Sequence, residues 1–216
     1  MKSCIVIGGG ASVEEGINLG LWDKIKEQEI WSINFAFMTM PFLPKRELWI
    51  DTSFFRNNLT QLENLYKQGV SCHTKKNNKY ALITEINTYD TSRNRNEALS
   101  SNKIFVGSMG LSGFFALSLA CKEEYNLVYI LGYDFGKIEN KDITHYYQNK
   151  LNIISSGVNK PELYLNNNQV KKEVEEFDYY LNYKTKIVNV SPKSKINCFE
   201  KIDYPEFFRR LNGNLS

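Results

Sequence analysis

The sequence predicts an α/β fold: a single Rossmann-like domain over residues 1–216, with a mostly parallel sheet that helices cover on both faces. Three observations support this prediction. Short apolar runs alternate along the chain with segments whose apolar residues recur at helical spacing. Glycine-rich turns follow several of those runs. The chain has 216 residues, 42% of them hydrophobic, which is enough for one substantial core.

The first part of the chain supplies three strands and one long helix. Residues Cys4–Ile7 form a short apolar run that glycine ends, and Ser12 is placed to cap the helix that follows. Further strands are predicted at Ile30–Ile33 and at Glu47–Asp51. Apolar residues at helical spacing then predict a helix over Ser53–Gly69, with the glycine as its stop.

The middle of the chain, around residues 74–103, is expected to be irregular and mobile. It contains one strand candidate, Tyr80–Ile86, followed by the polar run Asn87–Asn102. We interpret this run as a surface loop because its composition cannot bury much surface. The short basic cluster His73–Lys79 is interpreted as a solvated loop, since charged runs that define a partner are usually longer.

The last part of the chain returns to a strong pattern. Lys103–Glu124 combines a short strand, a glycine–serine turn and an apolar helix, and Asn126–Gly136 contains the clearest buried strand. A last strand is predicted over Lys186–Pro192 and a short helical region over Cys198–Leu211. Before this last strand lies a helix whose apolar face is formed by Val170, Val174, Phe177 and Leu181.

Small and polar residues follow the predicted strands, and they are the candidate ligand-binding residues. In sheets of this kind, ligands bind beyond the carboxyl ends of the strands. Glycine permits close approach of a ligand, and the amides of a helix N-terminus attract phosphate, although a tight turn alone also needs glycine. We expect one nucleotide-binding crevice lined by Gly8, Gly9, Gly10, Ser12, Asn34, Asp51, Ser53, Gly107, Ser108, Gly110 and Ser112.

The candidate catalytic residues are Asp134, His145 and Tyr146. Asp134 ends the clearest strand, where a carboxylate could bind a hydroxyl, an ammonium group or a metal, or cap the next segment. His145 is one of two histidines, and this side chain is the usual acid or base near neutral pH. The sequence contains no GxSxG, HExxH or CxxC motif, so hydrolase triads and zinc mechanisms lack support.

Composition argues against several classes of partner. The chain has 27 Lys and Arg against 24 Asp and Glu, a net charge of +3, and the charges are interspersed, so nucleic acid is not an expected partner. No apolar stretch reaches the roughly 18 residues that a membrane span needs. No signal region is apparent, and we therefore expect a cytoplasmic protein. A homo-oligomer is compatible with this sequence.

Five segments occur in an order that resembles a known family: IVIGGGAS, SINFAF, LWIDTSFF, GSMGLSGFFALSLA and VYILGYDF. The order is similar to that of the bacterial lipooligosaccharide sialyltransferases, whose first loop runs like G-N-G-P-S. It also resembles the hydroxymethylpterin diphosphokinase-like (MptE-like) group, in which a G-x-D-(F/L) strand end precedes a Thr-His pair. The matching residues here are Gly132, Asp134, Phe135, Thr144 and His145.

The sialyltransferase resemblance implies a nucleotide-dependent glycosyltransferase that moves a sugar from a CMP-sugar to an acceptor hydroxyl. It implies that Gly8–Ser12 holds the nucleotide phosphates, that Asn34 contacts the nucleotide, and that the Asp51 and Gly107 loops line the same cleft. The sequence departs from the family at Gly9 and Ala11, which replace asparagine and proline. The family's catalytic histidine is also missing from the equivalent region, so His145 or Tyr146 must serve.

Two other functions remain open. The diphosphokinase resemblance implies transfer of a diphosphate from ATP to a hydroxymethyl acceptor, with Mg²⁺ bound by Asp134. A non-catalytic nucleotide-binding module is the second alternative, and it would bind nucleotide without turnover. In each transferase interpretation the partners are a small nucleotide donor and a hydroxyl acceptor.

Overall fold

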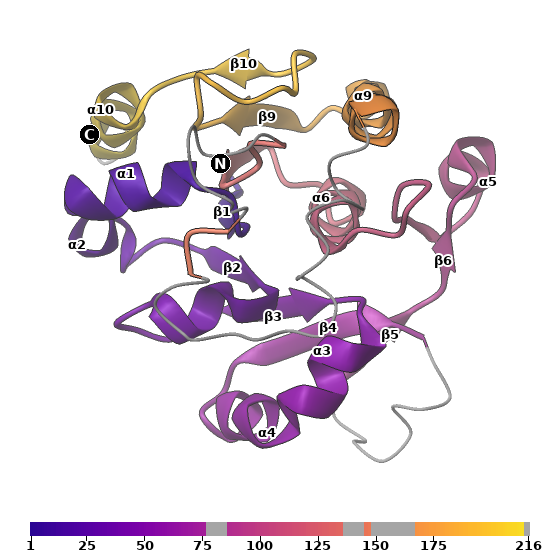
Figure 1. The fold of residues 1–216 in the computed structure, drawn as a ribbon, viewed down its shortest axis with the longest axis horizontal. Coiled ribbons are helices and arrows are strands. Elements are labelled where there is room, and N and C mark those ends of the chain that lie inside the picture. Colours follow the sequence, from indigo (N-terminus) through magenta and orange to yellow (C-terminus); the bar gives the residue numbers. More distant parts are fainter. Residues whose placement is uncertain (77–85, 136–144, 148–166, 214–216) are drawn as a thin grey trace.

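The computed structural model describes residues 1–76, 86–135, 145–147 and 167–213, and its centre is one eight-stranded sheet (Figure 1). The strand order is β10-β9-β8-β1-β2-β3-β4-β5, and every neighbouring pair is parallel. A separate parallel pair joins β6 to β7. The strands are β1 (Ser3–Ile7), β2 (Ile30–Ile33), β3 (Arg46–Trp49), β4 (Ser71–Lys75), β5 (Asn87–Tyr89), β6 (Thr91–Ser92), β7 (Ile104–Phe105), β8 (Leu127–Leu131), β9 (Lys186–Asn189) and β10 (Glu200–Lys201).

Helices cover both faces of the sheet, as the sequence predicts. Along β1, Cys4 and Val6 pack into the core that contains α6, whereas Ile5 and Ile7 pack into the core that contains α1, α2 and α10 (Figure 1). Burial on both faces explains why the strands are continuously apolar. The helices are α1 (Ser12–Asn18), α2 (Leu21–Ile25), η1 (Asn34–Thr39), α3 (Thr52–Asn57), α4 (Leu59–Lys67), α5 (Arg95–Ser100), α6 (Ser112–Lys122), α9 (Asn167–Glu175), η3 (Glu176–Asn182) and α10 (Tyr204–Gly213).

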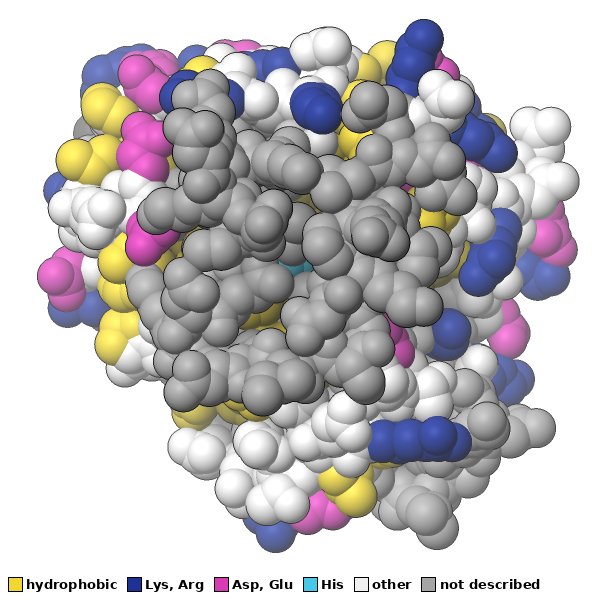
Figure 2. Space-filling view, in the orientation of Figure 1, with side chains coloured by type: hydrophobic (Ala, Val, Ile, Leu, Met, Phe, Trp, Pro, Cys, Tyr) yellow, Lys and Arg dark blue, Asp and Glu magenta, His cyan; other side chains and the backbone are white. Residues whose placement is uncertain are grey.

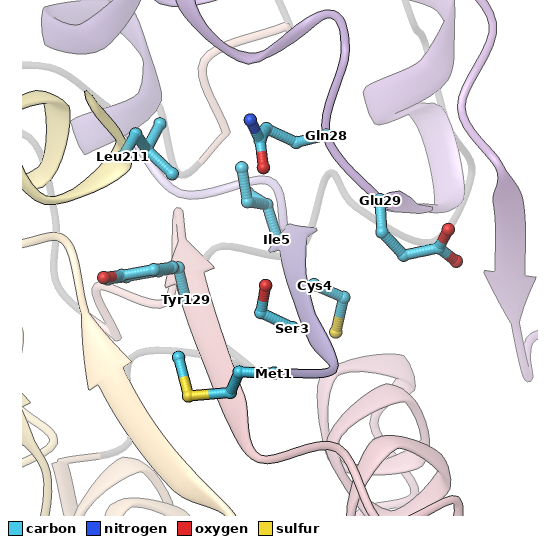
Figure 3. Close-up of a pocket in the computed structure, with 8 residues that line it drawn as sticks. All are labelled: Met1, Ser3, Cys4, Ile5, Gln28, Glu29, Tyr129 and Leu211. Atoms are coloured by element: carbon cyan, nitrogen blue, oxygen red, sulfur yellow. The ribbon is translucent and has the colours of Figure 1, made fainter. Parts of the chain in front are cut away.

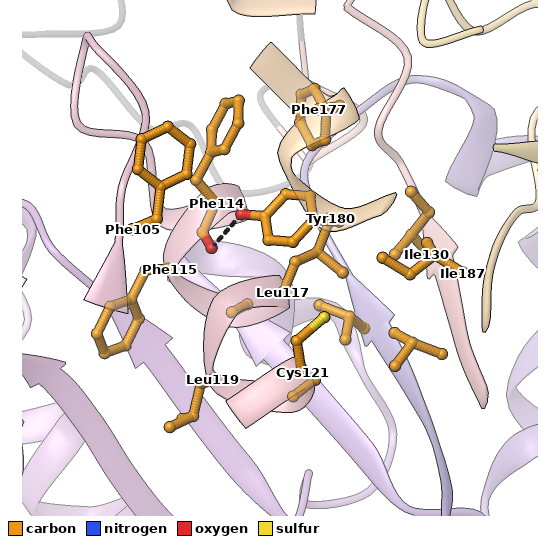
Figure 4. Packing of buried hydrophobic residues seen from close by; sticks show 14 of the residues in the cluster. Phe105, Phe114, Phe115, Leu117, Leu119, Cys121, Ile130, Phe177, Tyr180 and Ile187 are labelled. Carbon is orange, nitrogen blue, oxygen red and sulfur yellow. Dashed lines mark hydrogen bonds between the residues drawn. The ribbon is translucent and has the colours of Figure 1, made fainter. Parts of the chain in front are cut away.

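Helix α6 is enclosed by aromatic and aliphatic side chains (Figure 4). The ring centroids of Phe114 and Phe177 lie 4.2 Å apart, and the Tyr180 hydroxyl donates to the Phe114 carbonyl at 2.7 Å. A helix that is apolar on all sides needs such enclosure. The packing holds the N-terminus of α6 at the carboxyl edge of the sheet, where Tyr133 donates from its hydroxyl to the Gly113 carbonyl at 3.1 Å.

The chain order creates a switch point between β1 and β8. The chain builds β1 to β5 in one direction and then returns to place β8 on the other side of β1. Ligands of open α/β sheets bind at such a point. Ile7 pairs with Leu131, so the turns that follow the two strands are neighbours. The Gly10 amide donates to the Gly132 carbonyl at 2.9 Å.

The prediction of a surface loop over Asn87–Asn102 is wrong. This run forms β5, β6 and α5, and the Asn94 side chain caps α5 by accepting from the Glu97 amide at 3.1 Å. Short edge strands and a capped helix need little apolar surface, which explains why composition did not indicate them. The loop prediction for His73–Lys75 is also wrong, because these residues belong to β4. Residues 77–85, which include most of the strand candidate, lie outside the described residues.

Two helix predictions are corrected in detail. The expected helix over Ser53–Gly69 is divided into α3 and α4 at Asn58, whose side-chain amide donates to the Phe54 carbonyl at 2.7 Å. The predicted apolar face of Val170, Val174, Phe177 and Leu181 is wrong at Leu181, which is 63% exposed. The tighter 3₁₀ turns of η3 change the face there, so Tyr179 and Tyr180 are buried instead.

Candidate functional site

Three segments converge at the carboxyl edge of β1 and β8: the Gly8–Ser12 loop, the Asp134 turn and the His145–Tyr147 segment. The two carboxylate oxygens of Asp134 accept from the Ser12 amide at 2.7 Å and from the Ser12 hydroxyl at 2.6 Å. The Tyr146 amide donates to the Gly9 carbonyl at 2.9 Å. The predicted first loop and the predicted catalytic residues are therefore neighbours.

The glycines of the first loop are needed for close packing between these segments. A Cβ atom on Gly9 would lie 2.1 Å from His145 Cδ2 and 2.7 Å from the Tyr147 hydroxyl. A Cβ atom on Gly10 would lie 2.5 Å from the Gly132 carbonyl oxygen. Glycine is the residue that permits such an approach. Phosphate binding by this loop stays a prediction, and the Ser12 amide that would serve it already donates to Asp134.

Asp134 has a structural role at the start of α1. Its carboxylate satisfies donors that would otherwise be unpaired, at the helix end that favours negative charge. Among the residues that the structure describes, no group of three or more His, Cys, Asp or Glu side chains is arranged to hold a metal ion. Magnesium is usually held by one or two carboxylates, with water and substrate phosphates as its other ligands, so magnesium binding at Asp134 stays a prediction.

We expect Asp134→Ala to lower the free energy of unfolding by about 1–2 kcal/mol, because Ser12 loses both acceptors at the start of α1. Asp134→Asn should lose less, since the carboxamide oxygen still accepts one bond. Urea denaturation of the two variants measures this difference. Asp23→Ala, at an exposed carboxylate of α2, is the matched control. An Asp134→Ala variant as stable as this control would contradict the capping role.

His145, at the carboxyl edge of β1 and β8, is partly exposed. Its ring stacks on Tyr147 with centroids 5.2 Å apart, and burial lowers the pKa of His145 to about 4. The lowered pKa keeps the imidazole neutral at pH 7, the form in which a general base acts, and it also makes the ring a weaker base. Thr144, the partner of His145 in the diphosphokinase pattern, lies outside the described residues.

Tyr146 is buried, in contrast to His145. Its hydroxyl lies 2.7 Å from the Thr39 hydroxyl, and burial raises the pKa of Tyr146 to about 12. These properties favour a structural role over proton transfer. Of the two catalytic candidates in this segment, the geometry therefore favours His145.

A second convergence joins the turns after β2 and β3 to the start of α6. Ser112 donates from its hydroxyl to the Asn34 side-chain oxygen at 3.3 Å and accepts from the Ile50 amide at 3.2 Å. Asn34 has a φ of 54°, a left-handed conformation that asparagine tolerates. The N-cap residue of α6 is Leu111, whose apolar side chain forms no capping hydrogen bond, and the first amides of α6 lie at this edge of the sheet. Two predicted binding residues, Asn34 and Ser112, are thus in contact.

The sequence did not indicate Glu47, which supports the turn at Asn34. Glu47 lies fully buried on β3, where the Ser32 hydroxyl donates to its carboxyl group. Burial raises the pKa of Glu47 well above its usual range, and hydrogen bonds from Ser32 and from the Asn34 backbone oppose this rise. The one feature of the sequence that could have indicated Glu47 is a charged residue within an apolar strand. A charged residue is found there only when it is buried with hydrogen-bond partners.

Asp51 and Ser53 lie after β3 and interact with each other. The Asp51 carboxylate caps α3 by accepting from the Ser53 amide at 2.7 Å and from the Ser53 hydroxyl at 2.8 Å. The pair therefore has a local structural role at the start of α3. Its contact with a nucleoside stays a prediction.

The Gly107–Gly110 turn is occupied by carboxylates of this chain. The Ser108 amide donates to Glu176 at 2.8 Å, and the Ser108 hydroxyl and the Met109 amide donate to Glu173 at 2.7 and 2.9 Å. The amide and hydroxyl of Ser108 and the amide of Met109 therefore already have acceptors within the chain. The sequence did not indicate either glutamate, because both lie more than sixty residues further along the chain.

Arg93, which lies between β6 and α5, packs beside the Gly107–Gly110 turn. The sequence did not indicate this residue either. Its guanidinium nitrogen Nη2 lies 3.2 Å from the position that a Cβ atom on Gly110 would take. Arg93 is exposed, and it forms no ion pair within the described part of the chain. Gly110 is two residues from Ser112, so a cation lies close to the start of α6.

A hollow of about 220 Å³ lies at the other end of the sheet, near the beginning of β1 (Figure 3). It contains none of the predicted binding or catalytic residues. It is lined by Met1, Ser3, Cys4, Ile5, Gln28, Glu29, Tyr129 and Leu211. The convergence of side chains at the carboxyl edge, and not this hollow, therefore defines the candidate site.

The charges are mixed on the face of the molecule that Figure 2 shows. Around the rim, where the side chains are coloured, lysine and arginine side chains lie among aspartate and glutamate side chains. Within the described ranges, no helix has both the length and the apolar character that crossing a bilayer requires.

The fold is similar to that of solved sialyltransferases. No protein-family model matches the chain, and no curated protein does. The sialyltransferase CstII from Campylobacter jejuni, in complex with the substrate analogue CMP-3FNeuAc, is 14% identical with a TM-score of 0.56, over 94% of this chain and 86% of that chain. A tyrosine-to-phenylalanine variant of sialyltransferase CST-II in complex with CMP is 11% identical with a TM-score of 0.54, over the same shares. The predicted sialyltransferase-like α/β fold is confirmed.

Proposed function

We propose that this protein is a glycosyltransferase of the sialyltransferase type, which transfers a sugar from a CMP-sugar to an acceptor hydroxyl. The observation that carries the proposal is the contact between Asn34 and Ser112 at the start of α6, where the N-cap residue Leu111 has no polar side chain. The fold supports it, because similar structures were solved with CMP and with a CMP-sugar analogue.

The donor phosphate would lie at the start of α6. The amides of the first helical turn attract an anion, and the exposed Arg93 guanidinium beside Gly110 adds a positive charge. The side-chain nitrogen of Asn34 would donate to the base or to the ribose. Asp51 and Ser53 would border the nucleoside, and the Gly8–Ser12 loop would line the opposite side of the crevice.

His145 would act as the general base. The acceptor hydroxyl oxygen attacks the anomeric carbon of the sugar and forms the new glycosidic bond, while its proton passes to the neutral imidazole. The bond between the anomeric carbon and the phosphate oxygen breaks, and CMP leaves with the electron pair. Positioning of donor and acceptor and stabilisation of charge on the leaving phosphate would supply most of the rate enhancement.

The test is a thermal-shift screen against CMP, UDP, GDP and ATP, each with and without magnesium. We expect CMP to stabilise the protein without metal, by about 2.7 kcal/mol at a concentration one hundred times its Kd. Release of CMP from a CMP-sugar then measures transfer. Stabilisation only by ATP with magnesium would favour the diphosphokinase alternative, and binding without turnover would favour a binding module. No response to any nucleotide would overturn both transferase functions.

Two variants localise the site within the same screen. Asn34→Gly removes the amide and keeps the left-handed backbone, and Arg93→Ala removes the exposed cation. Each should weaken CMP binding about tenfold, the effect of losing one polar contact to a charged or buried group. Arg209→Ala, at an exposed arginine of α10, should bind CMP as the wild type does. Equal affinity in all three variants would place the nucleotide elsewhere.

A further inference from the structure

Glu173 is the most buried carboxylate at the carboxyl edge besides Glu47. It is 2% exposed, although it lies on α9, a helix whose neighbouring acid Glu175 is largely exposed. One oxygen of Glu173 accepts from the Ser108 hydroxyl and the Met109 amide. Among the described residues, its other oxygen has no hydrogen-bond partner. A buried acid in this state is costly, so it needs a reason.

The contacts of Glu173 show what it holds. Ser108 and Met109 are the central residues of the Gly107–Gly110 turn, and the turn closes through the Gly110 amide, which donates to the Gly107 carbonyl at 3.2 Å. The Leu111 amide donates back to Val106 at 2.8 Å, and α6 begins at the next residue. The turn therefore connects directly to Ser112.

The turn is also adapted to this carboxylate. Gly107 has a φ of 72°, and a Cβ atom on it would lie 3.0 Å from Glu173 Oε2 and 2.9 Å from Phe114 Cδ2. Glu176 adds a second bond, by accepting from the Ser108 amide. The turn is thus clamped by two acids from one helical segment, and its glycine leaves space for one of them.

We propose that Glu173 is a positioning residue of the donor site, which fixes the turn that presents Ser112 and the first amides of α6 to the nucleotide. This inference rests on the proposed function. Glu173 does not itself touch the donor; it acts through Ser108 and Met109. Loss of the clamp should therefore impair donor binding specifically and leave acceptor binding unchanged.

The experiment compares Glu173→Ala with Glu173→Gln and with the exposed control Glu175→Ala. We expect Glu173→Ala to raise the KM for the CMP-sugar about tenfold, because two donors of the turn lose their acceptor. The KM for the acceptor should not change. Glu173→Gln should stay within about twofold of the wild type, since its carboxamide oxygen can accept the same two bonds.

A second measurement separates this inference from the proposed function. Amide hydrogen exchange at Ser108 and Met109, without nucleotide, should be faster in Glu173→Ala than in Glu175→Ala. If exchange at these amides is equally slow in the two variants, Glu173 does not hold the turn, and this conclusion does not depend on the transferase activity. Faster exchange with an unchanged donor KM would overturn the positioning role. A wild-type chain that transfers nothing would overturn the proposed function and with it the positioning role.

Ser108→Ala provides the comparison if Glu173→Ala does not fold. This variant removes the hydroxyl donor and leaves both glutamates and the backbone amides in place. We expect about a threefold rise in the donor KM, a smaller effect because one of the two bonds to Glu173 persists. A wild-type donor KM in Ser108→Ala, together with unchanged hydrogen exchange at Met109, would overturn the proposal.

Discussion

Replacing His145 with alanine is expected to lower the kcat for sugar transfer by about 10²- to 10⁴-fold, the range that a general base contributes. The imidazole is neutral at pH 7, partly exposed, and placed beside Gly9 at the switch point of the sheet. Donor affinity should change little, because the proposed nucleotide contacts belong to Asn34, Arg93 and the start of α6. Single-turnover transfer from a CMP-sugar, with CMP affinity measured separately, checks both statements.

The pH dependence gives an independent check on His145. A base acts in its deprotonated form, and burial lowers the pKa of His145 to about 4. The rate should therefore be independent of this group at neutral pH and fall as the pH drops through about 4, where the imidazole gains a proton. A rate that falls already near the ordinary histidine pKa of about 6.5 would contradict the lowered pKa of His145.

The control for His145 is its neighbour Tyr146. Tyr146→Phe removes a hydroxyl whose partner is Thr39, and it should leave kcat nearly unchanged with a small loss of stability. The opposite pattern, with an active His145→Ala variant and an inactive Tyr146→Phe variant, would assign the reaction to the tyrosine. Thermal denaturation of both variants shows whether lost activity reflects lost structure.

The second large effect is expected for Gly10→Ala, which should lower the free energy of unfolding by about 3 kcal/mol, the upper range for an overpacked site. The added Cβ would lie 2.5 Å from the Gly132 carbonyl oxygen and 2.7 Å from Asp134 Oδ2. The first of these atoms belongs to the backbone and cannot rotate away. The turns after β1 and β8 must therefore move apart, and the contact between Asp134 and Ser12 is weakened.

Two other glycines calibrate this result. Gly9→Ala meets the side chains of His145 and Tyr147, which can rotate, so its cost should be smaller than that of Gly10→Ala. Gly213→Ala has no atom within 4 Å of the new Cβ, and it should change stability by less than about 1 kcal/mol. Equilibrium denaturation should rank the losses in this order. A Gly10→Ala variant as stable as Gly213→Ala would contradict the close packing of the two turns.

Local signals in the sequence were sufficient for most of the fold. The apolar runs at Cys4–Ile7, Ile30–Ile33 and Leu127–Leu131 each lie in a strand of the parallel sheet, because a strand buried on both faces must be continuously apolar. The edge strands β5 and β10 were missed for the converse reason. They are short and partly exposed, so their residues carry no such pattern.

The candidate site was predictable in part. Asn34 and Ser112 follow two predicted strands, and the rule that ligands bind at strand carboxyl ends was enough to select both. Arg93 and Glu173 could not be selected in this way, because Arg93 lies in a polar run and Glu173 in an amphipathic helix. Their significance depends on their contacts with the Gly107–Gly110 turn, and those contacts join residues that are distant in the sequence.

By itself, the sequence determined the strands, the helices that cover them and the glycine-rich turns at the carboxyl edge, because periodicity and turn chemistry are local properties. The tertiary structure alone decided which donors of those turns are already satisfied. Ser12 is bonded to Asp134 across 122 positions of the chain, and Ser108 to Glu173 across 65. Such partners depend on how the chain is folded, and no local pattern encodes them. Because Ser12 is already bonded to Asp134, our proposal puts the nucleotide at the start of α6, whereas the sequence had favoured the first glycine loop.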